Sequence, residues 1–212
     1  MLIKFLLIHS KYLDLRMNFL AHIYLSGENI PLMIGNFIGD FVKGNDYKKY
    51  PEEVQNGIRL HREIDSYTDS HEVVLESKKR LRDKYRHYSG VITDIYYDHF
   101  LANNWGSYHD SELESFTHQF YNTMEDNRLT LPDKVNYVLF HMKRDNWLYQ
   151  YRTLDGIGKA LYGMSRRTKF NSRMDESVKD LEMDYDLYKG EFDRFFPELE
   201  VRCKSFIESL NS

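Results

Sequence analysis

The sequence contains little cysteine, little proline and no long apolar run, and each shortage excludes a class of protein. Cys203 is the one cysteine among 212 residues, so neither a disulfide scaffold nor a zinc site built from cysteines is available. No apolar stretch approaches the roughly 18 residues that a membrane span needs. With neither an export signal nor paired cysteines, the sequence predicts a cytoplasmic protein with no membrane partner.

The first 16 residues, MLIKFLLIHSKYLDLR, do not form a convincing secretory signal. Their apolar stretch is short, and no small-residue cleavage site follows it. Met17 then opens a segment that looks like a natural beginning. We therefore expect residues 1–16 to be an N-terminal extension upstream of the native start, and residues 17–212 to form a single domain.

The excess of acids over bases is small and unevenly distributed. The net charge is −4 at neutral pH, yet residues 175–200 alone hold ten acids and only three bases. The rest of the chain is therefore slightly basic. Its positive charge is concentrated at Lys78–Arg86 and Arg166–Arg173, which can steer an anionic partner, although a solvated helix face has the same composition. The net acidic charge argues against a nucleic-acid partner.

Apolar residues recur mainly at helical spacing. Pro31, Pro51 and Pro132 each precede an apolar periodic run, as proline does in the first turn of a helix. No segment alternates polar and apolar residues between hairpin turns, so no strand is predicted. These patterns predict an all-α fold, a single-domain helical bundle. The expected helices span residues 18–26, 31–43, 51–68, 71–87, 90–105, 111–126, 132–150, 153–164 and 173–208, with the last broken near Pro197 and its acidic part laid on the outside.

Acids and histidines interrupt the apolar stripes of four of these helices. His61 and Asp65 are four residues apart on the stripe of the helix expected at 51–68. Asp94 and Asp98 are four apart within VITDIYYDHFL, an almost continuous apolar run. A buried carboxylate is costly unless it is paired, hydrogen-bonded or bound to a metal. Two of them on one face therefore favour a cation partner.

The same spacing recurs at Asn36 and Asp40, and at Asn18 and His22. A single histidine in an apolar segment is ordinarily a satisfied core residue, and a single His–Asp pair is more often an ion pair than a site. Four such pairs on separate helices are, however, what a bundle needs to build a metal centre. Oxygen ligands combined with imidazole suit Mn²⁺, Mg²⁺ or Fe²⁺.

Taken together, these segments resemble the acyl carrier protein phosphodiesterases, a family regarded as a divergent branch of the HD-type metal phosphohydrolases. The resemblance covers Met17 to about Phe196 and rests on MNFLAHIYLS (17–26), GNFIGDFVKG (35–44), GIRLHREIDSYTD (57–69), DIYYDHFLANNW (94–105) and LYGMSRRT (161–168). It implies an HD-phosphohydrolase-like fold. It also implies hydrolysis of the phosphodiester that joins 4′-phosphopantetheine to a serine of holo acyl carrier protein. The His-Asp doublet of the HD-type enzymes is reversed here, as Asp98-His99.

The resemblance also implies a Mn²⁺ centre, with Mg²⁺ or Fe²⁺ as alternatives. That metal would lower the pKa of a bound water, which would attack phosphorus. The expected metal ligands are His22, Asp40, His61, Asp65 and Asp98, or a subset of them.

Further residues are expected to assist the reaction from around the metal. Asp94, His99 or Asp69 would orient ligands or move protons. Positive charge would offset the charge that develops on the phosphoryl group. The candidates for that role are Arg62, Arg166 and Arg167.

The implied partner, holo acyl carrier protein, is small and acidic, and Lys78–Arg86 or Arg166–Arg173 would dock it. Two other interpretations remain open. A metal phosphohydrolase that acts on a small nucleotide or phosphate ester would share the site and need no docking surface. A non-catalytic helical interaction module would pair its buried acids with lysine or arginine and bind no transition metal.

Overall fold

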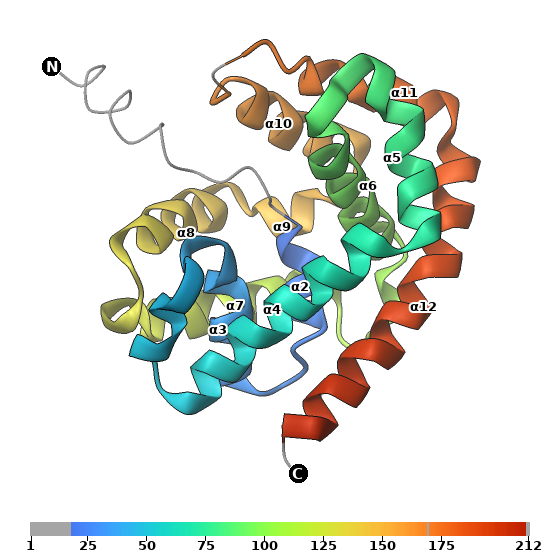
Figure 1. Ribbon diagram of the computed structural model, residues 1–212. Helices are drawn as coiled ribbons and strands as arrows, with labels where there is room; N and C mark the ends of the chain where they lie inside the picture. Colours follow the sequence, from blue (N-terminus) through green and yellow to red (C-terminus); the bar gives the residue numbers. More distant parts are fainter. Residues whose placement is uncertain (1–17, 169, 211–212) are drawn as a thin grey trace, which may run out of the picture.

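A computed structural model describes residues 18–168 and 170–210 of the chain. Within these ranges the chain forms α-helices and short 3₁₀ turns and no strand, which confirms the predicted all-α class (Figure 1). The expected extension at residues 1–16 and the proposed start at Met17 lie outside the described residues. The α-helices are α2 (Phe19–Tyr24), α3 (Ile30–Ile38), α4 (Glu52–Ser70), α5 (Glu72–Tyr85), α6 (Ser89–Asn103), α7 (Leu113–Asp126), α8 (Asp133–Asp145), α9 (Trp147–Gln150), α10 (Leu154–Ser165), α11 (Ser177–Met183) and α12 (Tyr185–Leu210).

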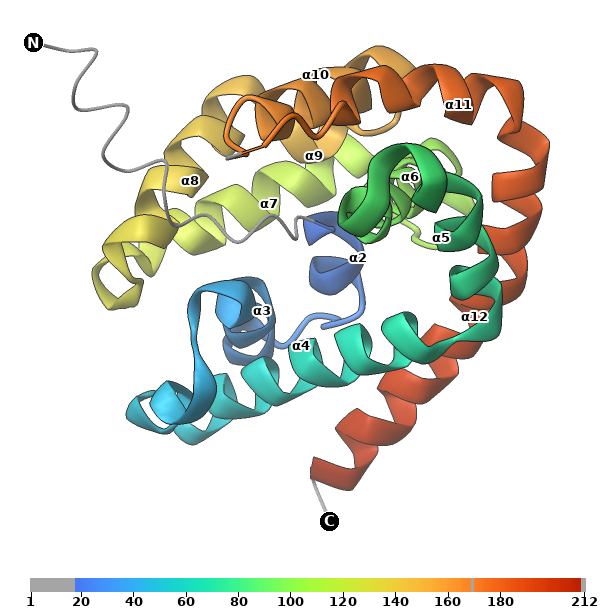
Figure 2. The ribbon, with the colours of Figure 1, turned by 45° about the horizontal axis from the view of Figure 1, so that its top comes forward.

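The short helix α2 lies in the middle of the molecule, where it packs against α3 and α6 (Figure 2). All but one of its six residues are buried, including His22. The long helices α4 and α12 pass around this centre, and α12 packs against α4, α5 and α6. A polar side chain on α2 is therefore held in the interior by its position in the fold.

Helices α3 and α4 approach so closely that their backbones touch at two glycines. A Cβ placed on Gly35 would lie 2.1 Å from the Val54 carbonyl oxygen, and one placed on Gly57 would lie 2.2 Å from the Leu32 carbonyl oxygen. Real side chains do not tolerate such distances, so glycine is required at both positions. This contact fixes the distance between the polar residues of α3 and those of α4.

Helix α6 contains the almost continuous apolar run and is buried on nearly all sides. It packs against α2, α5, α10 and α12, and residues Ile92, Ile95, Phe100 and Leu101 have no exposed surface. Its neighbours on every side explain why its sequence shows no polar face. Any carboxylate on α6 must therefore be satisfied from an adjacent helix.

The expected break of the last helix near Pro197 is wrong. The chain breaks instead at Asp184, between α11 and α12, and α12 continues through Pro197 to Leu210. Proline removes one backbone hydrogen bond and strains the preceding turn. The buried stripe of α12, which includes Phe192, Phe196 and Leu199, outweighs that loss by packing on the core.

The helix expected at 132–150 is divided by Asn146 into α8 and α9. Asn146 adopts a left-handed backbone conformation with φ 45° and ψ 53°. Asparagine tolerates this conformation better than most residues. None of the helices within the described residues is both long and apolar enough to cross a lipid bilayer.

Candidate metal centre

Three of the residues singled out in the sequence, His22 of α2 and His61 and Asp65 of α4, converge on one point. One potential ligand atom from each lies within 4.8 Å of the other two. Asp65 places Oδ1 3.4 Å from His22 Nε2 and Oδ2 3.4 Å from His61 Nε2. The imidazole side chains are 3% and 6% exposed, whereas the carboxylate is 22% exposed. The cluster is thus nearly buried and reaches solvent through Asp65.

Asp40 joins the cluster from the other side. It lies in the 3₁₀ turn η2 (Gly39–Phe41), and its Oδ1 is 3.3 Å from His61 Nε2. The preceding residue, Gly39, lies against the His61 ring, so that a Cβ there would come within 2.2 Å of the ring carbon Cγ. Glycine at this position therefore gives His61 the room it needs beside Asp40.

Asn36 of α3 controls the orientation of both imidazole rings. Its side-chain amide donates to the His22 carbonyl oxygen and to Ser26 Oγ, which leaves Oδ1 as the acceptor 2.7 Å from His22 Nδ1. The backbone carbonyl oxygen of Asn36 accepts from His61 Nδ1 at 2.9 Å. Because both acceptors require a proton on Nδ1, the neutral rings carry their lone pairs on Nε2. Both lone pairs then point into the cluster.

This arrangement is compatible with a bound cation. Lone pairs on two imidazole nitrogens face carboxylate oxygens of Asp40 and Asp65, and like partial charges at such distances repel each other. Within the described residues, the buried His22 Nε2 has no hydrogen-bond partner. Burial lowers the pKa of His61, but the hydrogen bond and charge of Asp40, the charge of Asp65 and the Asn36 carbonyl outweigh it and raise that pKa. The donor set therefore fits a divalent metal held by imidazole and carboxylate.

Asp98, which the sequence predicts to be a metal ligand, lies against the start of α2. Its carboxylate is fully buried and accepts two backbone hydrogen bonds at the start of α2, from Leu20 N–H at 3.0 Å and Ala21 N–H at 2.9 Å. Burial raises the pKa of Asp98 to about 7, and these two amides and the nearby His22 oppose the rise. Asp98 therefore holds the helix that carries His22.

Asp94 and Asp69 lie beside the cluster. Burial raises the pKa of Asp94 to about 7, and the charges of Asp65 and Asp69 add to the rise while those of Lys78 and His22 oppose it. Asp69 accepts a hydrogen bond from Lys78 Nζ at 2.6 Å. The sequence indicates a role for Lys78 only in a docking surface. Its place next to Asp94 depends on the packing of α5 on α6, which no local motif encodes.

His99 and Arg62 are placed away from the point of convergence. The ring nitrogens of His99 contact the Tyr151 carbonyl oxygen at 2.8 Å and the Tyr185 hydroxyl at 2.9 Å, so both are already engaged. Burial lowers the pKa of His99. Arg62 donates to the Gly44 carbonyl oxygen at 2.7 Å, over the Tyr47 ring.

The basic segment Lys78–Arg86 is partly neutralised within the molecule. Lys78 pairs with Asp69, Arg80 with the buried Glu191, and Lys84 with Asp180. Lys79, Arg82 and Arg86 are exposed and belong to none of these pairs.

The second basic segment, Arg166–Arg173, is less available. Arg173 pairs with Glu176, and Arg167 lies over the Trp147 ring. Burial lowers the pKa of Arg167. Lys169 lies outside the described residues.

Comparison with known proteins agrees with the resemblance seen in the sequence. The family model for acyl carrier protein phosphodiesterase matches residues 17–199. The chain belongs to this family. Relatives named acyl carrier protein phosphodiesterase include those of Photorhabdus laumondii, 34% identical over 89% of this chain and 96% of the relative, and Pectobacterium atrosepticum, 32% identical over 89% and 98%. No solved structure matches the chain, so the HD-like character of the fold stays a prediction.

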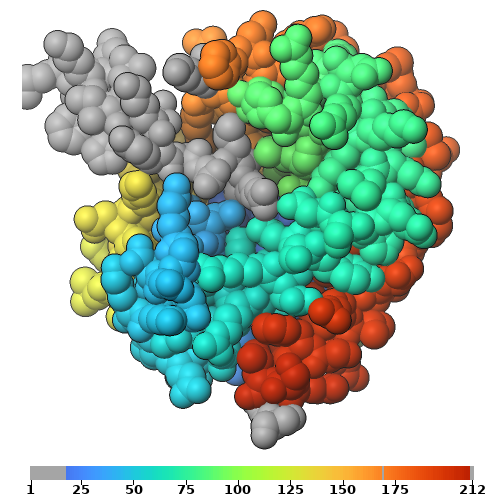
Figure 3. All heavy atoms as spheres, viewed as in Figure 1, coloured from blue at the N-terminus to red at the C-terminus, as the bar shows by residue number. Residues whose placement is uncertain are grey.

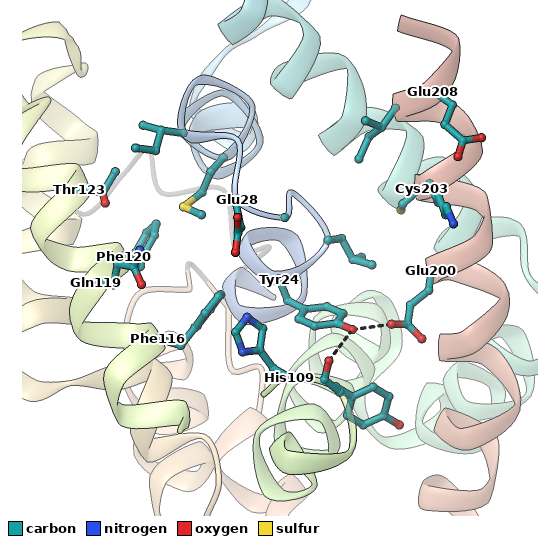
Figure 4. Close-up of a pocket in the computed structure, with 17 residues that line it drawn as sticks. Tyr24, Glu28, His109, Phe116, Gln119, Phe120, Thr123, Glu200, Cys203 and Glu208 are labelled. Carbon is teal, nitrogen blue, oxygen red and sulfur yellow. Dashed lines mark hydrogen bonds between the residues drawn. The ribbon is translucent and has the colours of Figure 1, made fainter. Parts of the chain in front are cut away.

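This family member also has an open groove on the other side of α2, between α7 and α12 (Figure 4). The groove encloses about 780 Å³, and its wall includes Phe116, Phe120 and Cys203. Tyr24 donates to Glu200 at 2.6 Å and to the Tyr108 carbonyl oxygen at 3.2 Å across its floor. None of the residues predicted for metal binding or catalysis lines it.

Proposed function

We propose that this protein hydrolyses the phosphodiester between 4′-phosphopantetheine and a serine of holo acyl carrier protein. Water adds to phosphorus, the bond from phosphorus to the serine oxygen breaks, and the serine oxygen gains a proton as the water loses one. The products are apo acyl carrier protein and 4′-phosphopantetheine. The observation that supports this most strongly is the convergence of two imidazole lone pairs and a carboxylate in a member of this family.

The residues proposed to hold the metal are His22, His61 and Asp65, with Asp40 completing the set. Mn²⁺ is the metal we propose, and Mg²⁺ and Fe²⁺ suit the same oxygen and imidazole donors. When bound, such an ion supplies a Lewis acid for the phosphoryl oxygen and lowers the pKa of water. Asn36 contributes by fixing both Nδ1 protons, which directs the Nε2 lone pairs to one point.

The neighbouring residues divide between positioning and proton transfer. Asp98 anchors the start of α2 and so sets where His22 lies. Asp94 is the carboxyl group that we propose for proton transfer, because its pKa of about 7 lets both forms exist at neutral pH. Arg62 stabilises the segment after Asp40 through the Gly44 carbonyl oxygen. We assign no proton transfer to His99, whose two nitrogens are already engaged.

The outward face of α5 is the proposed docking surface for the carrier protein. Lys79 and Arg82 are exposed, and they follow the half-exposed Leu75 at intervals of four and three residues. These intervals place all three on one face of the helix, and α4 and α5 together form a broad face of the molecule in Figure 3. Lys78, on the same helix, donates to Asp69, which lies four residues beyond the proposed ligand Asp65. An acidic partner that covers this face would therefore lie beside the site.

The decisive experiment is incubation of holo acyl carrier protein with the protein and Mn²⁺, followed by intact mass measurement. Loss of the phosphopantetheine mass from the carrier is the expected result. Asp65→Ala should abolish it, whereas Asp110→Ala, which removes an exposed carboxylate outside the cluster, should not. A panel of nucleotides and small phosphate esters runs in parallel. Turnover of the panel with an unchanged carrier mass would reject the proposed substrate.

A further inference from the structure

Lys78 extends from α5 across the start of α6 to Asp69, near the end of α4. Its side chain is only 15% exposed, and its Nζ lies 2.6 Å from Asp69 Oδ1. A Cβ placed on Gly90 would be 3.7 Å from Lys78 Cε, which puts the aliphatic chain of the lysine over Gly90. Gly90 and Asp94 are four residues apart on one face of α6. The Lys78 side chain therefore lies over the face of α6 that also carries Asp94.

The charge of the Lys78 ammonium group acts on Asp94, which in turn is influenced by residues of the cluster. After burial, which raises the pKa of Asp94 to about 7, the charge of Lys78 is the strongest influence on that carboxyl group. Asp94 responds in turn to Asp65 and His22, which belong to the cluster itself. We therefore expect a substrate phosphate bound at the cluster to lie within reach of Lys78.

Lys78 differs in this respect from the other internally paired bases of α5. Arg80 forms an ion pair with Glu191 and lies over the Tyr188 ring, and Lys84 forms an ion pair with Asp180. Among the described residues, the Lys78 ammonium has one hydrogen-bond partner, Asp69. An ammonium group has three N–H donors, so two donors remain for a ligand while Asp69 holds the group in place.

A phosphodiester that enters this site meets an unfavourable field. Asp40, Asp65 and Asp94 are all carboxyl groups, and the phosphodiester is itself an anion, so their charges repel it. A metal ion offsets this repulsion from the side of the two histidines. A second cation is needed on the side of α5 and α6, and lysine suits the task because it binds phosphate as a compact point charge.

We propose that Lys78 is a phosphate-binding residue, which contacts a non-bridging phosphoryl oxygen of the substrate, and that Asp69 is the residue that positions it. This inference rests on the proposed function for the identity of the substrate. It adds to that function a specific residue and a specific contact, on the side of the pocket formed by α5 and α6.

The test compares Lys78→Met and Lys78→Arg with Lys189→Met. Lys189 is a matched control because its Nζ also lies 2.6 Å from an aspartate, Asp193, on the outer part of α12. With Mn²⁺ and holo acyl carrier protein, Lys78→Met should lower kcat/KM on the order of 10²-fold, the usual effect of losing one charge-stabilising donor. Lys78→Arg should recover most of that loss, and Lys189→Met should match the unaltered protein.

A second readout tests the contact without turnover. Inorganic phosphate should raise the Tm of the Mn²⁺-loaded protein, and Lys78→Met should lose that rise while keeping the rise that Mn²⁺ alone produces. If Lys78→Met does not fold, Lys78→Gln, which keeps a donor for Asp69, replaces it in both assays.

The two proposals fail in different ways. An unaltered protein that leaves holo acyl carrier protein intact rejects the proposed function, and the phosphate-dependent rise in Tm then still tests Lys78. An active protein in which Lys78→Met keeps both kcat/KM and the phosphate-dependent rise overturns the assignment of Lys78. A Lys78→Met variant that also loses the rise in Tm produced by Mn²⁺ alone overturns the assignment as well. Lys78 would then be needed for the structure of the metal site and not for binding phosphate.

Discussion

Asp98 gives the sharpest test of how the centre is assembled, because its two backbone hydrogen bonds separate an anchoring role from metal binding. Asp98→Ala leaves the buried N–H groups of Leu20 and Ala21 without acceptors. Each unsatisfied buried donor costs about 1–3 kcal/mol. Two such donors would cost about 2–6 kcal/mol.

The net effect should lie in the lower half of that range. Burial raises the pKa of Asp98 to about 7, which shows that the ionised carboxylate is itself held at a cost. Removing it recovers part of that cost. We therefore expect the free energy of unfolding to fall by about 2–3 kcal/mol, out of the roughly 5–15 kcal/mol typical of a domain.

Urea unfolding in EDTA measures this quantity, because no metal then contributes to stability. Asp110→Ala, at an exposed position, serves as the control and should change little. Asp65→Ala, by contrast, should lose the gain in stability that added Mn²⁺ gives the unaltered protein. An Asp98→Ala variant within about 0.5 kcal/mol of the unaltered protein, the ordinary scatter of surface substitutions, would refute the anchoring role.

Three further results are expected from other parts of the fold. Gly57→Ala should strongly destabilise the protein in urea unfolding, because its Cβ would overlap the Leu32 carbonyl oxygen. Gly190→Ala is the control, since nothing lies within 4 Å of the added Cβ, and it should stabilise α12 by about 0.5–1 kcal/mol. Equal effects of the two substitutions would show that the contact of α3 with α4 is not as close as described. Glu191→Ala should cost about 3–5 kcal/mol in the same assay, because it leaves the Arg80 guanidinium without its buried partner; a loss below 1 kcal/mol would contradict this. Burial raises the pKa of the Cys203 thiol to about 12, so a thiol reagent at pH 8 should label it slowly in the native protein and fully in denaturant; fast native labelling would contradict its burial.

Local spacing was enough to predict the helical class and most of the cluster. His61 and Asp65 are placed on one face by their interval of four residues, and the apolar setting of His22 and Asp40 indicated that they also face inward. The structure brings these four side chains together. The family resemblance was confirmed by comparison, whereas the roles of the individual residues stay predictions.

What the sequence did not reveal depends on contacts between distant segments. Asp98 and His99 are neighbours in the chain, yet the helical rotation between them directs one to α2 and the other to Tyr151 and Tyr185. Lys78 approaches Asp94 only because α5 packs on α6. The break at Asp184, which was expected near Pro197, shows the same limit. A strong local breaker was overridden by packing that the local sequence does not specify.

The position of Asn36 couples the two histidines of the proposed metal centre. One residue holds both imidazole rings, His22 through its side chain and His61 through its backbone. A shift of α3 therefore displaces the two Nε2 atoms together. Substitutions that loosen α3, even far from the centre, should weaken both imidazole contacts in a single step and leave no half-formed site.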